Sequence, residues 1–481
     1  MQGGVTHFGW PRFCLNPAVL GLSGTLKHGC RRHRNSSVGR PQLLVHDGDV
    51  ALIVDPQRDI DRVEAAARDA GVRITHVAET HLHNDYVTGG LVLAEKHGAA
   101  YLVNAEDHVT FTRVPVSDGQ VLRVGRLVVT VVATPGHTHT HLSYVVRDEA
   151  HDGGPAAVFS GGSLLYGSVG RTDLVSPHDT ATLAHHQYSS VRRLVSSAHP
   201  DAPLYPTHGF GSFCSTGPAS RQESSTIGEQ ALSNHALTDP DEDHFVAELL
   251  ENLTAYPAYY AHMSPLNAAG PGAADLSVPD SVEAGELGRR LRAGEWVVDL
   301  RHRVAFADSH LQGSVGFEYG TGENFTSYLG WVIPWNQPLT LLGPLAEVEK
   351  AIRDLARIGI DSPDAAVGPD PGEWAPGYPQ ASYPHGDWTL LLRERNPEDV
   401  VLDVRRPDEF GTSHVAGALN IPVYELLGRI TEVPDARIWV HCATGYQAGV
   451  AASLLDRAGR DVVLVNARFR DAAGAGIEVA T

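Results

Sequence analysis

A repeat in the second half of the chain constrains the fold more than any other feature of the sequence. Asp299, Phe306, His310 and Gly313 recur as Asp403, Phe410, His414 and Gly417, each 104 residues further on. A constant offset over four positions indicates two copies of one module. The chain has 481 residues, and since domains hold roughly 100 to 200 residues each, we expect two to four units.

The rest of the chain divides around this repeat. Residues 1–42 are rich in basic side chains and hold no acidic ones, which predicts a disordered leader, and they lack the apolar region of a signal peptide. Residues 43–262 mix strands and helices, including a helix that ends at Gly71, and predict a layered α/β domain. The two copies occupy residues 278–362 and 387–475. The intervening residues 363–386, rich in Pro and Gly, predict a linker.

The composition excludes two classes of function. The net charge of -20 has the wrong sign for a surface that holds nucleic-acid phosphates. The chain also lacks the roughly 18 consecutive apolar residues that would cross a membrane. Four scattered cysteines are too few for a disulfide framework, so we expect a reducing, cytoplasmic compartment. The chain contains 26 histidines, the commonest metal-ligating residue, so their spacing decides what they do.

Histidines follow three apolar strands. His81 and His83 lie two residues apart in the first of these loops, so their side chains can point the same way and share an ion. His137 follows a tight Pro-Gly turn after the second strand, and His208 follows the third. A single loop histidine is commonly structural, but three such loops in this order favour a metal centre.

These loops resemble the metallo-β-lactamase superfamily, whose αββα sandwich carries an H-x-H-x-D-H loop, a later G-H-T loop and a final His. Within it, Asp-Pro-Gln at 55–57, Thr-Gly-Gly at 88–90 and Gly-Arg-Thr-Asp at 170–173 look most like the persulfide dioxygenases. Those enzymes hold one Fe(II) with two histidines and an aspartate. The resemblance implies that His81 and His137 bind iron. It also implies that Arg171 pairs with a substrate carboxylate.

Two positions depart from the family pattern. Gly162 stands where the family has the ligating aspartate, and Tyr86 replaces a histidine that helps to hold a second metal. We therefore expect His83 to join His81 and His137 around a single ion. Three neutral ligands suit Fe(II), which we expect, and also Zn(II), the alternative. Asp85 is assigned a catalytic role, and Tyr86 and His208 are assigned to substrate binding.

The repeated half resembles rhodanese domains, small α/β sulfurtransferases. The matching segments are Asp403-Val404-Arg405, Glu409-Phe410 and the run from His414 to Pro422. Cys442 lies on a loop between an apolar strand and a helix, where backbone N–H groups and the helix dipole stabilise a thiolate or a persulfide. Gly445 and Gln447 of this loop are assigned to substrate binding, although Gln447 replaces the usual Arg. The first copy has no cysteine, which predicts a catalytically silent scaffold.

The expected fold class is therefore α/β: a metallo-β-lactamase sandwich followed by two rhodanese-like α/β domains. The resemblance implies oxidation of a low-molecular-weight thiol persulfide, of glutathione or another thiol, to sulfite, coupled to sulfane-sulfur transfer by Cys442. Two alternatives stay open: a metal-dependent thiolester hydrolase of the glyoxalase II type, and a non-catalytic sulfur-carrier or regulatory protein. We expect neither a nucleic-acid nor a membrane partner, and the formation of a homo-oligomer stays open.

Overall fold

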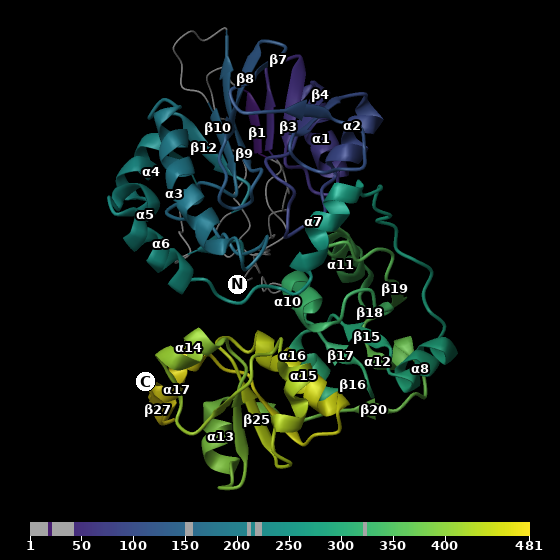
Figure 1. Cartoon of the computed structure of the whole chain (residues 1–481). Coiled ribbons are helices and arrows are strands. Elements are labelled where there is room, and N and C mark those ends of the chain that lie inside the picture. The colour runs from purple at the N-terminus through teal and green to yellow at the C-terminus, as the bar shows by residue number, and fades with distance from the viewer. Residues whose placement is uncertain (1–17, 22–42, 150–156, 209–212, 217–223, 321–324) are drawn as a thin grey trace, which may run out of the picture.

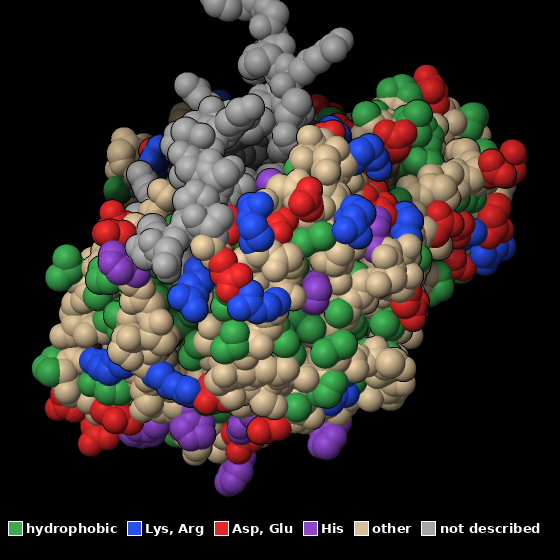
Figure 2. Space-filling model, turned by 90° about the horizontal axis from the view of Figure 1, so that it is seen from above, with side chains coloured by type: hydrophobic (Ala, Val, Ile, Leu, Met, Phe, Trp, Pro, Cys, Tyr) green, Lys and Arg blue, Asp and Glu red, His purple; other side chains and the backbone are tan. Residues whose placement is uncertain are grey.

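A computed structural model describes residues 18–21, 43–149, 157–208, 213–216, 224–320 and 325–481. Figure 1 shows an N-terminal domain above two smaller α/β units, which we call the first copy and the second copy. Figure 2 shows Lys and Arg side chains next to Asp and Glu over one face of the molecule. No helix of the described ranges is long and apolar enough to cross a membrane.

The N-terminal domain contains two six-stranded sheets with a shared apolar core. The first sheet contains, in order, β1 (Ala18–Gly21), β2 (Leu43–His46), β3 (Val50–Val54), β4 (Arg73–Ala78), β5 (Ala100–Asn104) and β6 (Val114–Val116). The second contains β14 (Ser225–Thr226), β12 (Pro203–Pro206), β10 (Ala157–Gly161), β9 (Leu142–Asp148), β8 (Leu127–Ala133) and β7 (Val121–Val124). Leu52 and Val54 of one sheet belong to the same buried cluster as Val129 and Tyr144 of the other.

Helices cover the outer face of each sheet (Figure 1). They are α1 (Asp61–Ala70) and α2 (Gly90–His97) on the first sheet, and α3 (Thr180–Ser196), α4 (Ile227–Ser233), α5 (His235–Thr238) and α6 (Glu242–Glu251) on the second. The predicted helix end at Gly71 is confirmed, since α1 stops there and Gly71 adopts a left-handed φ of 69°. The predicted αββα sandwich is thus present.

One short strand lies within the segment predicted to be a disordered leader. β1 pairs in parallel with β2, with Ala18 opposite Leu43. The other residues of the segment 1–42 lie outside the described residues, so for them the leader stays a prediction.

The two copies repeat one another element by element. The first contains α8 (Ala284–Ala293), β15 (Trp296–Asp299), α9 (Arg303–Asp308), β16 (His310–Leu311), β17 (Val315–Gly316), α10 (Phe325–Val332), β18 (Leu339–Gly343), α11 (Leu345–Arg357), β19 (Asp364–Val367), α12 (Pro371–Trp374) and β20 (Gln380–Ala381). The second contains β21 (His385–Gly386), α13 (Trp388–Glu394), β22 (Val400–Asp403), α14 (Pro407–Thr412), β23 (His414–Val415), β24 (Leu419–Asn420), α15 (Leu426–Arg429), β25 (Ile438–His441), α16 (Tyr446–Arg457), β26 (Val462–Val465), α17 (Ala472–Ala475) and β27 (Val479–Ala480). From α8 to β17, each element begins 104 residues before its counterpart.

The segment 363–386, predicted to be a linker, is instead part of both copies. β19 pairs with β18 in the sheet of the first copy, and β20 pairs with β16. β21 is the edge strand of the sheet of the second copy, where it pairs with β26. The prediction was wrong because strands of two to four residues carry little periodicity, and their Pro and Gly neighbours resemble those of a flexible connection.

The units are packed against each other, not loosely tethered. One buried apolar cluster includes Tyr259 and Met263, at and just after the end of the N-terminal domain, together with Leu329 of α10 and Val440 of β25. α7 (Tyr260–Ala269) leads from the N-terminal domain into the first copy (Figure 1). Arg357 of α11 also pairs with the buried Asp59 at 2.7 Å. α10 therefore lies in a core shared by all three units.

Candidate functional site

Three histidines from different strand ends meet in the interior of the N-terminal domain. His81 follows β4, His137 follows β8 and His208 follows β12, and all three are buried. Their ring centroids are 4.9 Å (His81 to His137), 5.3 Å (His81 to His208) and 5.1 Å (His137 to His208) apart. One nitrogen from each ring lies within 4.8 Å of the other two, so the three can share one ion.

Hydrogen bonds orient these rings. The Nδ1 of His137 lies 2.8 Å from the Arg171 carbonyl, which can only accept, so this nitrogen carries the proton and Nε2 keeps its lone pair. His81 Nδ1 lies 2.9 Å from the Thr80 hydroxyl, which itself donates to Asp55. The same logic leaves the lone pair of His81 on Nε2. His208 Nδ1 lies 3.2 Å from a carboxylate oxygen of Asp85.

The donor set fits a divalent cation. His81 Nε2 and His208 Nε2 are 3.3 Å apart, close to the separation of about 3.3 Å expected between two nitrogens bound at roughly 2.0 Å to one tetrahedral ion. Burial, together with the neighbouring imidazoles, holds the pKa of His81 well below its usual range and that of His137 at about 3. The rings of His81 and His137 are therefore neutral, the state in which imidazole binds a metal. His137 Nε2 is buried and has no hydrogen-bond partner among the described residues.

His83, the expected third ligand, faces two carboxylates instead. Its Nε2 lies 3.2 Å from Asp55, 3.3 Å from Glu79 and 2.9 Å from the Tyr86 hydroxyl. Burial lowers the pKa of His83, but the two carboxylates outweigh burial and raise it to about 10. Its other ring nitrogen, Nδ1, has no hydrogen-bond partner among the described residues. Within those residues, the group of mutually close ligand atoms that contains His81 and His137 includes His208 and not His83. The geometry therefore favours His208, which the sequence had assigned to substrate binding, as the third ligand in place of His83.

The Tyr86 hydroxyl forms hydrogen bonds within the loop. It donates to the backbone carbonyl of Asp55 at 3.1 Å and accepts from His83 Nε2 at 2.9 Å. The assignment of Tyr86 to substrate binding stays a prediction. Asp85 lies beside His208, and the two form with His83 a second group of mutually close ligand atoms.

Arg171 also forms its hydrogen bonds with other residues of this chain. Its guanidinium forms a bidentate ion pair with Asp173 at 2.6 and 2.7 Å and donates to the carbonyls of Phe213 and Thr254. It also lies over the Tyr256 ring and is buried. All three of its nitrogens are engaged, so the structure does not support the expected pairing with a substrate carboxylate. Arg171 fixes the segment whose carbonyl orients His137.

Gly162, the position of the missing aspartate, lies directly against His137. A side chain there would bring its Cβ within 2.2 Å of the His137 ring. The Gly162 backbone N–H donates to His141 Nε2 at 3.0 Å. The glycine therefore leaves space for the ring that the cluster uses.

Asp55, which the sequence assigned no role, connects the loops. Its carboxylate accepts from the backbone and the hydroxyl of Thr80, each at 2.7 Å, and from the hydroxyl of Thr207. Thr80 and Thr207 immediately precede His81 and His208. Asp55 has a left-handed φ of 51°, uncommon for a residue with a side chain, and only its place at the end of a buried strand hinted at such a role.

The thiol loop of the second copy lies between β25 and α16. Cys442 is buried, and the Gly445 backbone N–H donates to its Sγ at 3.1 Å. Burial raises the pKa of Cys442, while the N–H groups of Ala448, Thr444 and Gly445 oppose the rise. Gly445 has a φ of 102°, which an L side chain rarely adopts, so the glycine permits this turn. The loop thus surrounds the sulfur with amide donors.

The first copy lacks this loop altogether. β18 ends at Gly343, and α11 begins at Leu345 after a single proline. Gln447 of the second copy donates its amide to the hydroxyl of Tyr328 on α10. The first copy thus holds no thiol of its own but contacts the loop of the second.

Comparisons with known proteins agree with this architecture. The rhodanese-like domain family matches residues 387–470. A metallo-β-lactamase from Staphylococcus aureus superimposes with a TM-score of 0.59 at 27% identity, over 66% of this chain and 92% of that one. The chain is a metallo-β-lactamase-fold protein with a C-terminal rhodanese-like domain.

Two curated relatives match the metallo-β-lactamase domain. The human mitochondrial persulfide dioxygenase is 26% identical over 241 residues, which are 49% of this chain and 79% of that protein. The hydroxyacylglutathione hydrolase of Acidiphilium cryptum is 35% identical over 127 residues, 24% of this chain and 52% of that enzyme. A third relative, from Bacillus velezensis, is named as a probable zinc-dependent hydrolase and is 28% identical over 166 residues. These dioxygenase and hydrolase relatives support an enzyme with a metal cofactor.

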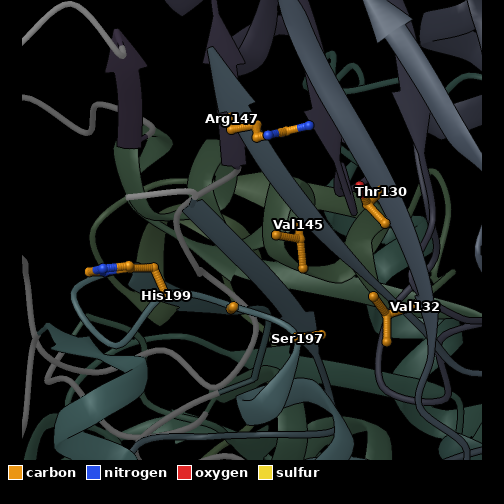
Figure 3. A pocket seen from close by; sticks show the side chains of 7 residues that line it. Thr130, Val132, Val145, Arg147, Ser197 and His199 are labelled. Carbon is orange, nitrogen blue, oxygen red and sulfur yellow. The ribbon is translucent and has the colours of Figure 1, made fainter. Parts of the chain in front are cut away.

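A groove on the outside of the metallo-β-lactamase domain is separate from the metal centre. It has a volume of about 290 Å³ and is lined by Thr130 and Val132 of β8, Val145 and Arg147 of β9, and residues 197–199 after α3 (Figure 3). None of the three clustered histidines is among its lining residues.

Proposed function

We propose that this protein oxidises a low-molecular-weight thiol persulfide to sulfite, and that its rhodanese-like domain carries sulfane sulfur on Cys442. One persulfide, one O2 and one water give a thiol, one sulfite and two protons, so atoms and electrons balance. The thiol would be glutathione or another small thiol. The activities of the relatives point in this direction, and the residues of this chain support it at two sites.

The observation that carries the proposal is the cluster of His81, His137 and His208. These three imidazoles could hold one ion, while His83 Nε2 faces Asp55 and Glu79. A bound Fe(II) would supply the binding of O2 and of the persulfide sulfur. Zn(II) fits the same nitrogens and would favour hydrolysis by an activated water. Hydrolases with a bridging hydroxide need two metals, and Tyr86 and Gly162 stand where the family pattern has ligands of such a pair.

The residues of this chain have four tasks in such a reaction. The three histidines fix the ion, and the backbone carbonyl of Arg171 and the carboxylates of Asp55 and Asp85 fix the histidines. Burial of all three rings keeps bulk water from the centre. Asp85 stands beside His208 and is the nearby carboxylate that can hold a proton during turnover.

The sulfur-transfer step needs no oxidant. The Cys442 thiolate attacks the outer sulfur of a donor persulfide, the donor S–S bond breaks as the Sγ–S bond forms, and the donor leaves as a thiolate. The amide donors of residues 444, 445 and 448 stabilise the negative charge on the sulfur before and after transfer. Because Gln447 is neutral, the loop offers no fixed positive charge at that position.

The experiment measures metal content, oxygen uptake and sulfite in protein purified without chelator. With glutathione persulfide we expect about one iron per chain and one sulfite per O2 consumed. His137→Ala should abolish both iron and oxygen uptake, whereas Cys442→Ser should keep the iron and lose only sulfur transfer. Protein that binds zinc, takes up no oxygen and hydrolyses S-lactoylglutathione would contradict the proposal and support the hydrolase. Metal-free wild-type protein whose Cys442 still accepts persulfide would point to a sulfur carrier.

A further inference from the structure

The thiol loop is completed by a residue of the copy that lacks a thiol. Tyr328 lies on α10 of the first copy, and its hydroxyl accepts a hydrogen bond from the Nε2 of Gln447. Its ring lies 5.6 Å from that of Tyr446, the first residue of α16. Two residues of the loop helix therefore contact one tyrosine of the other copy.

The direction of this hydrogen bond decides what the tyrosine can do. An amide Nε2 can only donate, so the phenol oxygen accepts and its own proton stays free for another acceptor. Burial raises the pKa of Tyr328, and the charge of a Cys442 thiolate adds to the rise. The phenol therefore keeps its proton near neutral pH. Cys442 belongs to the buried cluster against which Tyr328 packs.

The charged side chains around the loop are paired with other groups. Arg303 of the first copy contacts the loop at the Thr444 carbonyl, but it pairs with Glu318 at 2.5 Å and bonds Asn466 at 2.8 Å. Arg406 pairs with Asp408 at 2.9 Å and with Glu409 at 3.4 Å. Tyr328 differs from these arginines, because its hydroxyl accepts the hydrogen bond from Gln447 and does not use its own proton in it.

The position of Tyr328 is fixed by packing. On the same helix Trp331 stacks on Tyr424 of the second copy with centroids 4.1 Å apart and planes 6° from parallel. On its other side Trp331 meets Phe213 of the metallo-β-lactamase domain edge to face at 5.2 Å. α10 is thus held between the other two units, which limits how far the hydroxyl can move from the loop.

We propose that the Tyr328 hydroxyl donates a hydrogen bond to the sulfur carried on Cys442. This donor takes the place of the arginine that rhodanese domains usually have where Gln447 stands, and Gln447 orients the hydroxyl. The inference rests on the proposed sulfur-carrying role of Cys442. A neutral donor stabilises a singly charged persulfide with little cost in desolvation, but it compensates poorly for the two charges of thiosulfate. The first copy therefore sets the substrate class of the second, namely organic persulfides in preference to thiosulfate.

The test compares Tyr328→Phe with Tyr319→Phe in the full chain. Tyr319 is on the same copy, and its hydroxyl donates to Asp354 at 2.7 Å, so the control also removes one partly buried hydrogen bond. For each protein we would measure the pH profile of Cys442 alkylation, followed on the Cys442 peptide, and the rate of sulfur acceptance from glutathione persulfide and from thiosulfate. We expect Tyr328→Phe to raise the apparent pKa of Cys442 and to slow persulfide acceptance about tenfold or more, since hydrogen bonds to charged groups are the stronger ones. Tyr319→Phe should leave both unchanged.

Gln447 provides a second variant that keeps the packing of α10. Gln447→Met should slow persulfide acceptance less than Tyr328→Phe, and combining the two should add nothing, because both act through one hydroxyl. Gln447→Arg should raise the ratio of thiosulfate to persulfide acceptance. If wild-type Cys442 accepts persulfide and Tyr328→Phe changes neither the alkylation profile nor the rate, the inference is wrong and the proposed function stands. If wild-type Cys442 accepts no sulfur from either donor, the sulfur-carrying role fails and the inference fails with it.

Discussion

The carboxylate of Asp55 accepts a hydrogen bond from the backbone N–H of Thr80 at 2.7 Å, and this bond fixes the residue that precedes His81. The same carboxylate accepts a hydrogen bond from the hydroxyl of Thr207, the residue that precedes His208. One buried acid therefore sets the positions of two of the three clustered imidazoles, and it also lies 3.2 Å from His83 Nε2.

Replacing Asp55 should destabilise the metallo-β-lactamase domain. Asp55→Ala leaves His83 facing one carboxylate fewer and removes the acceptor of both threonines, which should cost about 3 to 5 kcal/mol. Asp55→Asn should cost less, because Asn tolerates the left-handed φ of 51° and still accepts from Thr80. Thermal unfolding followed with metal analysis checks both. Equal losses in the two variants would show that the charge, not the hydrogen bonds, holds the loops.

Substitution of single histidines should separate the ligands from their neighbours. His81→Ala, His137→Ala and His208→Ala should each lower metal content from roughly one ion per chain to a small fraction, since even residues that only orient ligands change affinity 10- to 100-fold. His83→Gln should keep the metal. Elemental analysis of the four proteins provides the measurement. Loss of metal in His83→Gln together with its retention in His208→Ala would restore the ligand set expected from the sequence.

Restoring the family aspartate should not restore the family site. In Gly162→Asp the new Cβ would lie 2.2 Å from the His137 ring, so the ring or the strand end must move. We expect a loss of about 1 to 3 kcal/mol in unfolding free energy from overpacking, with weaker metal binding. Gly285→Ala is the matched control, because nothing lies within 4 Å of its Cβ and it sits in α8. Tighter iron binding by Gly162→Asp than by wild type would contradict the clash argument.

The contact between the metallo-β-lactamase domain and the first copy should weaken in acid. Burial raises the pKa of Asp59, but Arg357 and Arg62 outweigh it and hold the pKa at about 2, below the usual 3.8. A depressed pKa gives stability that is present above pH 3.8 and is lost as the pH falls through 2, roughly 2 kcal/mol in all. Arg357→Met should therefore lower the melting temperature at pH 7, and its difference from wild type should shrink below pH 3.

The control for this pair is Arg193→Met. Arg193 pairs with Asp118 at 2.6 Å, but both side chains are about half exposed, so water screens the pair. Its removal should change the melting temperature little at any pH. A difference between Arg357→Met and wild type that stays constant from pH 7 to pH 2.5 would show that Arg357 acts through packing alone.

Local patterns in the sequence predicted a layered α/β domain and a repeated module, and the family resemblance of the histidine loops added the αββα sandwich. The repeat predicted two copies because identical residue types recur at one offset, and the structure extends that offset to whole elements from α8 to β17. The loops of His81, His137 and Cys442 were found because each follows an apolar strand and contains turn residues. Residues 363–386 were misread because short edge strands have no periodic pattern that distinguishes them from a linker.

The sequence by itself determined the fold class, the repeated module, the histidine-bearing loops and the thiol loop, since each depends on residues close together in the chain. Only the tertiary structure decided which histidines converge, because His83 is drawn to Asp55 and Glu79 while His208 arrives from a distant strand. It also decided the contacts of Arg171 and the approach of Tyr328 to Gln447. The physical reason is common to all of these: the partner of a buried polar side chain is set by which segments meet in space, and spacing along the chain does not encode that meeting.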